Sequence, residues 1–325
     1  MAKSSKSIAV RQKGNKLKYG KWGLIFILPF FIAYAVFQFY PLIMTFYKSM
    51  FKEFTHPVTL QHVVEFKGFG NYVSLFTEGS FLKYFGNTMI LWLLGFIPQI
   101  LVSLLFASWF TDIRLKLKGT GAMKVILYLP NMLMASSIAV LFSKLFALDG
   151  PINQMFGSEI FFLNNEWGIR LIVAGINFLM WTGNTTILLM AGIMGIDPAL
   201  YEAAAIDGAS ARQQFFKITM PMLKPIMLYV LVTSMIGGLQ MFDIPNLIVK
   251  DGGTQQVAYT VIMDVSKGIT GGGNIGLAGA ESVILFVIAA VIGGIMFKSM
   301  ESDEDKEKRK NRKRQKMEAK VARGV

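Results

Sequence analysis

Cysteine is absent from this sequence, and charged residues are scarce. The lack of Cys in 325 residues excludes a disulfide framework, a thiol nucleophile and a sulfur-ligated metal site. Charged residues make up 16% of the chain, against about 25% in an ordinary soluble domain. Hydrophobic residues make up 53%, so water is a poor solvent for most of the chain.

Sequence patterns for metal binding and for nucleotide hydrolysis are also missing. The two histidines, His56 and His62, have neither Cys nor a helical pair of carboxylates beside them, so no metal site is predicted. No Gly-x-x-x-x-Gly-Lys-Ser/Thr sequence occurs, and no lysine suited to phosphate follows the glycines at 271–273. We therefore expect the chain to have no catalytic residues, to bind no cofactor and to hydrolyse no ATP itself.

Long intervals with almost no charge predict an all-α, polytopic membrane bundle of six transmembrane helices. A helix needs about 20 mainly apolar residues to cross a hydrocarbon core about 30 Å thick. The last span must begin before Glu281, because the 16 uncharged residues between Glu281 and Lys298 rise only about 24 Å. That carboxyl should then lie near the outer boundary or face other helices. The expected spans are 22–47, 86–110, 124–146, 170–195, 225–249 and 275–297.

The distribution of Lys and Arg predicts the orientation in the membrane. Short cytoplasmic loops are enriched in these residues. With both termini cytoplasmic, 25 of the 33 Lys and Arg residues lie inside and eight outside. The net charge of +13 therefore reflects topology rather than a nucleic-acid-binding surface. Residues 1–21 form a basic cytoplasmic segment, 298–325 a charged cytoplasmic tail, and the first span is too long for a cleaved signal peptide.

Two segments on the predicted outer side have recognisable local patterns. The aromatics and glycines of 48–85, especially around Phe69, predict a short surface helix. The dense glycines of 268–279 predict a loop leading into the sixth span.

The cytoplasmic interval 196–224 predicts a helix, a sharp turn and a second helix. Asp197 is a suitable N-cap, and Pro198 is favoured at the first helical position, which starts a helix through about Ile206. Gly208 accepts the left-handed geometry of a helix end. The small side chains of the intervening alanines would let another protein approach the backbone closely.

The second helix of this interval has its own start signal. Ser210 and Gln213 form a capping-box pattern, which predicts a helix toward Met220. Pro221 and Pro225 are expected to bracket a bend of the chain into the fifth span.

The same interval resembles the EAA loop of ATP-binding cassette (ABC) importer permeases. The resemblance lies in Glu202-Ala203-Ala204-Ala205-Ile206-Asp207-Gly208-Ala209, followed by Phe216, Ile218, Pro221 and Pro225. It implies that the loop's first helix docks on a separate ATPase subunit, which uses ATP and Mg. The ATPase-coupling residues implied by the resemblance are Glu202, Ala203, Ala204, Asp207, Gly208 and Ala209.

Within that family the chain is most similar to carbohydrate permeases of the maltose-transporter type. The similarity rests on Phe69-Gly70-Asn71-Tyr72, Leu129-Pro130, and Phe242-Asp243 with Asp251-Gly252-Gly253. It implies the type I importer permease fold in a bacterial plasma membrane and import of a sugar or oligosaccharide. It also implies a heterodimer with a second permease, two ATPase subunits and an extracytoplasmic solute-binding protein. Lys250 and Thr254 flank the paired glycines where the family often has Thr and Pro.

Polar residues in the fourth and fifth intervals are candidates for a substrate pathway. Amides, carboxylates and hydroxyls hydrogen-bond sugar hydroxyls, and aromatic faces stack on sugar rings. Such groups can equally join helices by hydrogen bonds, and both interpretations stay open. The candidates are Asn177, Trp181, Gln240, Asp243 and Asn246.

Two other functions remain as alternatives. An ion-coupled secondary transporter would need no partner but would show inverted repeats and several buried ionisable groups, of which only Asp243 and Glu281 qualify. An ABC permease for phosphate, peptides or metals would share the EAA-like loop and would differ in the ligand of its binding protein.

Overall fold

The computed structural model describes residues 20–55, 61–112, 115, 117–271, 273–300 and 311, and the chain divides into two compact units at Tyr47. The first unit contains α1 (Gly20–Tyr34), a π-helical turn η1 (Ala35–Phe39) and most of α2 (Tyr40–Lys48). Together they form one apolar helix long enough to cross a membrane. The first predicted span, 22–47, falls on this helix. Most of the basic segment 1–21 and of the tail 298–325 lies outside the described residues.

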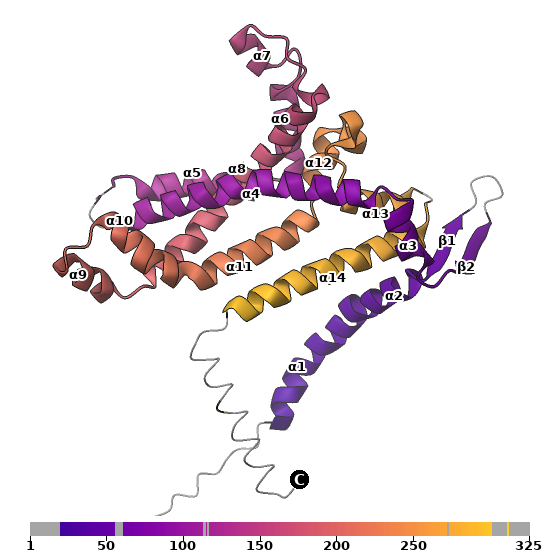
Figure 1. The fold of residues 1–325 in the computed structure, drawn as a ribbon, viewed down its shortest axis with the longest axis horizontal. Helices are drawn as coiled ribbons and strands as arrows, with labels where there is room; N and C mark the ends of the chain where they lie inside the picture. Colours follow the sequence, from indigo (N-terminus) through magenta and orange to yellow (C-terminus); the bar gives the residue numbers. More distant parts are fainter. Residues whose placement is uncertain are drawn as a thin grey trace, which may run out of the picture. The chain divides into compact units, whose positions relative to one another are not determined.

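Four long helices form the body of the second unit. They are α4 (Phe81–Thr111), α8 (Glu166–Met194), α11 (Met220–Leu239) and α14 (Ile275–Met300). Their long axes run in a common direction in Figure 1. Each is part of a helix that is long and apolar enough to span a membrane, and α14 begins before Glu281, as predicted. Glu281 is buried, and its carboxyl lies beside that of Asp264 of α13 (Val261–Thr270).

The third expected span is broken into two helices. α5 (Thr120–Met132) and α6 (Ala135–Leu145) meet at an angle of 96°, although the sequence predicts one span at 124–146. Pro130 cannot donate a backbone hydrogen bond in the last turn of α5, and Leu133 adopts an extended conformation after it. α6 and the short α7 (Pro151–Phe156) therefore project away from the long helices in Figure 1.

The fifth long helix lies earlier in the chain than the span expected at 225–249. α10 (Ala211–Gln214), the π-helical turn η4 (Phe215–Thr219) and α11 form one helix from 211 to 239. The two prolines expected to bracket a bend lie inside this helix, which continues through Pro221 and Pro225, and the π-helical turn η4 lies directly before Pro221. The helix instead ends after the paired glycines 237–238, and α12 (Asp243–Ile248) follows.

A small hairpin and short helices cover one end of the bundle. β1 (Phe51–Thr55) pairs antiparallel with β2 (His62–Phe66), and α3 (Gly70–Thr77) confirms the predicted short helix in this segment. The sequence did not predict the hairpin, and His56 lies outside the described residues. The remaining elements are α9 (Pro198–Ile206) and the 3-10 turns η3 (Phe162–Asn164), η5 (Lys250–Gly252) and η6 (Thr254–Gln256).

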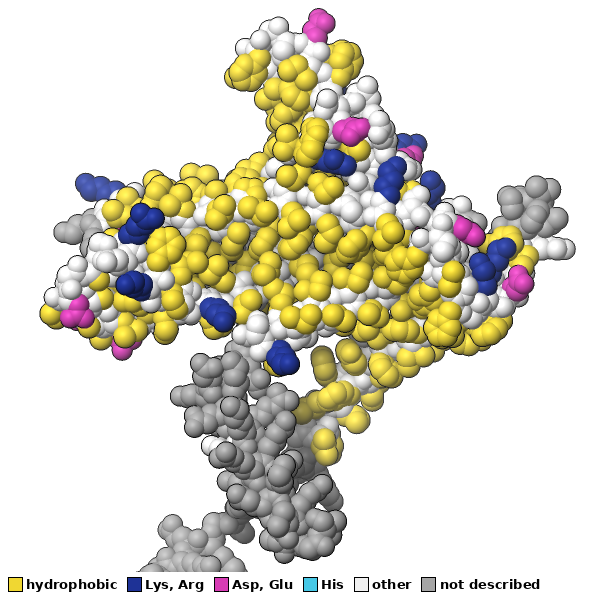
Figure 2. Space-filling model, in the orientation of Figure 1, with side chains coloured by type: hydrophobic (Ala, Val, Ile, Leu, Met, Phe, Trp, Pro, Cys, Tyr) yellow, Lys and Arg dark blue, Asp and Glu magenta, His cyan; other side chains and the backbone are white. Residues whose placement is uncertain are grey.

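The core lies between the helices, whereas much of the outer surface is apolar. Phe81, Tyr259 and Val261 belong to one buried cluster formed by α3, α4, α11, α13 and α14. Large side chains such as Leu101 (62% exposed) and Ile295 (63% exposed) face outward, and Figure 2 shows hydrophobic side chains along the long helices. Such an extensive apolar exterior is stable in lipid and not in water.

Candidate functional site

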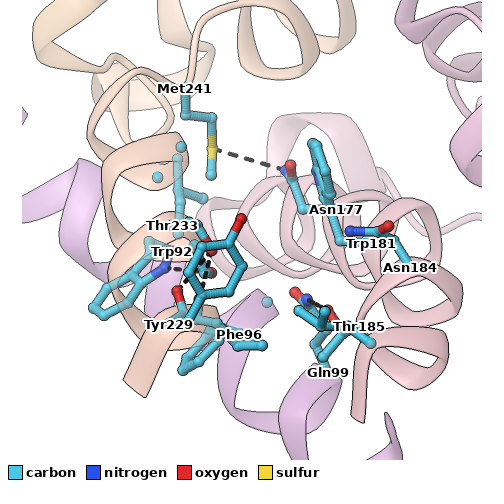
Figure 3. Close-up of a pocket in the computed structure, with 17 residues that line it drawn as sticks. Trp92, Phe96, Gln99, Asn177, Trp181, Asn184, Thr185, Tyr229, Thr233 and Met241 are labelled. Atoms are coloured by element: carbon cyan, nitrogen blue, oxygen red, sulfur yellow. Dashed lines mark hydrogen bonds between the residues drawn. The ribbon is translucent and has the colours of Figure 1, made fainter. Parts of the chain in front are cut away.

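A cavity of about 450 Å³ lies between α4, α8 and α11 (Figure 3). Its size is within the range of about 300–1,000 Å³ usual for small-molecule sites. Amides, hydroxyls and aromatic rings from all three helices line it. These residues are Trp92, Phe96, Gln99, Asn177, Trp181, Asn184, Thr185, Tyr229, Thr233 and Ser234.

Hydrogen bonds between the helices hold part of the cavity wall. Gln99 of α4 donates from Nε2 to Oγ1 of Thr185 on α8, at 2.7 Å, and both residues are buried. Trp92 of α4 donates from Nε1 to Oγ of Ser234 on α11, at 3.1 Å. The wall is therefore cross-linked at two points, and the groups that remain unpaired are available to a ligand.

The structure brings two of the five predicted pathway residues to the cavity. Asn177 lines it and donates to the carbonyl of Val173 at 2.9 Å, and Trp181 lines it with 49% of its surface exposed. The other three are also exposed but do not line the cavity: Gln240, Asp243 and Asn246. All three follow the end of α11 at Leu239, and of the described residues beyond that point only Met241 reaches the cavity.

The sequence reasoning missed the contribution of α4. Trp92, Phe96 and Gln99 face the cavity, and Trp92 stacks on Phe96 with ring centroids 5.4 Å apart. A signal was available, because Gln99 is an amide in the middle of a charge-free interval and such groups usually face the bundle. The neighbouring Thr186 does not line the cavity. Its hydroxyl donates within α8 to the carbonyl of Thr182 at 2.7 Å, which is a structural role.

The predicted helix pair of the interval 196–224 is present, and its start signals are confirmed. The side chain of Asp197 accepts a hydrogen bond from the backbone N–H of Ala199 at 2.9 Å, and Pro198 occupies the first turn of α9. The Ser210–Gln213 capping box forms in both directions, at 2.8 and 3.4 Å. Two separately capped helices therefore follow one another within a few residues.

Gly208 makes the sharp turn between α9 and α10. Its φ of +76° lies in the left-handed region, and the N–H of Ala209 donates back to the carbonyl of Ala204 at 2.9 Å. This is the usual hydrogen-bond pattern of a helix that ends in a glycine. A residue with a Cβ would be strained at this position.

The helix α9 is anchored on one side and exposed on the other. The hydroxyls of Tyr201 and Thr219 share a hydrogen bond of 2.8 Å, which ties α9 to the start of the fifth long helix. The predicted coupling residues Glu202, Ala203 and Asp207 are exposed, and Ile206 exposes 87% of its surface. Ala204 and Ala209 are half-buried and Gly208 is exposed. The helix thus presents a small-residue face flanked by two carboxylates.

Comparison with known proteins establishes the family. Residues 99–300 match the family described as binding-protein-dependent transport system inner membrane component. The chain belongs to this family. The matched range contains α8, α9 and α11, and therefore the EAA-like loop and most of the cavity wall. The predicted ABC permease family is confirmed, and the chain is a multi-pass membrane protein.

Curated relatives and solved structures support the same assignment. The lactose transport system permease protein LacF of Rhizobium radiobacter is 31% identical over 70% of this chain and 76% of its own. The multiple sugar-binding transport system permease protein MsmF of Streptococcus mutans serotype c is 27% identical over 85% of this chain and 94% of its own. A bacterial ABC transporter involved in import of the acidic polysaccharide alginate has a TM-score of 0.74 at 25% identity, with 86% and 96% of the chains covered.

Proposed function

We propose that this chain is a permease subunit of an ATP-driven ABC importer for a sugar or oligosaccharide delivered by an extracytoplasmic solute-binding protein. The observation that carries the proposal is the family match over residues 99–300. The names of the relatives support a carbohydrate, since LacF and MsmF belong to lactose and multiple-sugar systems. Family membership leaves the alternative of an ion-coupled secondary transporter without support.

The cavity has the chemistry that sugar transport requires. Sugar hydroxyls both donate and accept hydrogen bonds, and the amides and hydroxyls of the wall can satisfy both. The indole rings of Trp92 and Trp181 offer faces on which a sugar ring can stack. We place the substrate path through this cavity.

ATP coupling is proposed to pass through α9. Two ATPase subunits and a second permease complete the proposed complex, and the exposed face of α9 docks on one ATPase. The carboxylates of Glu202 and Asp207, the alanines between them and the exposed Ile206 suit a complementary groove. Rigid capping at both ends, by Asp197 and Gly208, lets movement of the ATPase displace the long helices.

The docking role is tested with Glu202→Ala and Gly208→Ala in the assembled complex. Each is expected to lower sugar uptake into proteoliposomes, and a lost docking interaction of about 1.4 kcal/mol corresponds to roughly tenfold. Glu159→Ala is the matched control, because Glu159 is an exposed acid far along the chain from α9. Full uptake coupled to ATP hydrolysis in both variants would contradict the role of α9.

The proposed substrate class, a carbohydrate, is tested with the cognate solute-binding protein. Calorimetry measures whether that protein binds neutral sugars, phosphate, peptides or metal ions. Binding of a sugar supports the proposal. A protein that ignores sugars but binds one of the other ligands would contradict it while leaving ATP-driven import intact.

A further inference from the structure

The cavity wall is rich in polar groups, yet no charged side chain lines it among the described residues. Its lining contains no Asp, Glu, Lys, Arg or His. The polarity comes from neutral amides, hydroxyls and indoles, on helices that otherwise present apolar side chains to the same space. A site of this composition stabilises hydrogen-bonding groups and offers no counter-ion.

The nearest charges on the same helices are remote from the wall. Arg170 precedes Asn177 by seven residues of α8, which is about 10 Å of helix rise. Lys224 precedes Tyr229 by five residues of α11, about 8 Å. The closest charge in sequence is Asp243, an exposed carboxylate two residues beyond the lining residue Met241, and it would repel an anion.

Several polar groups of the wall remain available for a neutral ligand. The side chains of Trp181, Asn184 and Tyr229 form no hydrogen bond within the part of the chain that the structure describes. The Asn184 amide can donate and accept, the indole can donate, and the phenol can do either. These are the partners that sugar hydroxyls need, whereas an ionised carboxylate in such a space would lose hydration without gaining a cation.

We propose, on the basis of the function proposed above, that this cavity admits uncharged saccharides and excludes saccharides that carry a carboxylate. The structural neighbour is described as importing an acidic polysaccharide. The shared fold therefore does not fix the charge of the substrate. In this chain the selection comes from the neutral wall contributed by α4, α8 and α11.

The test compares matched sugars on the purified permease–ATPase complex without the binding protein, which would add its own selectivity. The probes are lactose, maltose and trehalose, each paired with its derivative in which one primary alcohol is oxidised to a carboxylate. Binding is followed by tryptophan fluorescence, since Trp92 and Trp181 lie in the wall. We expect any neutral sugar that binds to do so at least about tenfold more tightly than its oxidised partner.

Two variants place a cation in the wall from opposite sides. Asn184→Lys on α8 and Thr233→Lys on α11 should each reduce this preference by about tenfold or reverse it, and high salt should weaken the effect. Glu159→Lys, an equal or larger charge change outside the cavity, should leave the preference unchanged. Using both lysine variants keeps the test valid if one of them fails to fold.

The outcomes separate this inference from the proposed function. Equal binding of neutral and oxidised sugars by the unmodified complex, or preference for the oxidised sugar, would overturn the charge selection but keep a saccharide site. An unchanged preference in both folded lysine variants would also overturn it, because the wall would not be its source. Binding of none of the six sugars would count against the saccharide cavity itself.

Discussion

Tyr259, which lies just before α13, contacts both α4 and α13. Its ring packs on that of Tyr84 with centroids 4.6 Å apart, and its hydroxyl donates to Oδ1 of Asp264 at 3.4 Å. The backbone carbonyl of Tyr259 accepts a hydrogen bond from Asn87 at 3.2 Å. Burial, together with the neighbouring Asp264 carboxylate, raises the pKa of this phenol above its ordinary value of 10.0. The phenol therefore stays neutral as a hydrogen-bond donor.

Replacement of this phenol should change the response of stability to alkaline pH. Because the pKa of Tyr259 is higher in the folded chain than in the unfolded chain, its contribution to the free energy of unfolding is complete below pH 10.0 and is lost as the pH rises further. The melting temperature measured in detergent should therefore fall more steeply above pH 10.0 in the unmodified protein than in the Tyr259→Phe variant. If the melting temperatures of the two proteins fell in parallel as the pH rises, the raised pKa of Tyr259 would be contradicted.

Single residues were predictable where their role depends on local sequence. Asp197 and Gly208 act within one or two turns of helix, so their caps could be read from neighbouring residues. Gln99 pairs with Thr185 across 86 positions of sequence, and such a partner is set by how two helices pack. Gln240 follows the end of α11 and does not line the cavity, and its place in the substrate pathway stays a prediction.

At the scale of elements, α5 and α8 cross with their backbones in close approach at Gly183. A Cβ added there would lie 2.7 Å from the Cα of Tyr128 and even closer to the carbonyl of Leu127. Both neighbouring atoms are backbone atoms, which cannot rotate away as a side chain would. Small residues at such crossings are the usual means of packing helices in a membrane. Gly183 therefore determines where the first half of the broken third span meets α8.

Gly183→Ala should loosen this crossing. Overpacking of this kind costs about 1–3 kcal/mol of unfolding free energy. Gly175→Ala is a matched control on the same helix, because no atom lies within 4 Å of its added Cβ. Thermal melting of the purified chain should fall for Gly183→Ala and remain unchanged or rise slightly for Gly175→Ala, since alanine favours helix. Equal melting temperatures for the two variants would show that the crossing tolerates a wider separation.

The sequence predicted that the long helices exist better than it predicted the residues at which they begin and end. Charge-free intervals located the long helices, but their ends depend on backbone geometry that composition does not report. The 96° break after Pro130 and the end of the fifth helix at Leu239 are two examples. The β1–β2 hairpin was missed because its strands are short and are stabilised partly by a distant residue: Asn274 accepts a hydrogen bond from the backbone N–H of Glu53 at 3.2 Å.

For the whole molecule, hydrophobicity sets the class and charge sets the orientation. The structure has five helices apolar and long enough to cross a membrane within its described residues, or six if α5 and α6 together form one span. Their exposed apolar side chains agree with the class predicted from composition. Orientation is a relation between the chain and a bilayer, and the cytoplasmic placement of both termini remains a prediction from the Lys and Arg distribution.

The absence of cysteine makes this orientation directly measurable, because any introduced thiol is the only one in the chain. Lys118→Cys lies in the short loop between α4 and α5, which the charge distribution places inside, and Glu159→Cys lies in the segment placed outside. Both side chains are exposed and neither lies on the proposed docking face of α9, so both should react with a membrane-impermeant maleimide once they are accessible. In intact cells Glu159→Cys should be labelled and Lys118→Cys should react only after permeabilisation. The reverse pattern would invert the topology and place α9 where no ATPase could reach it.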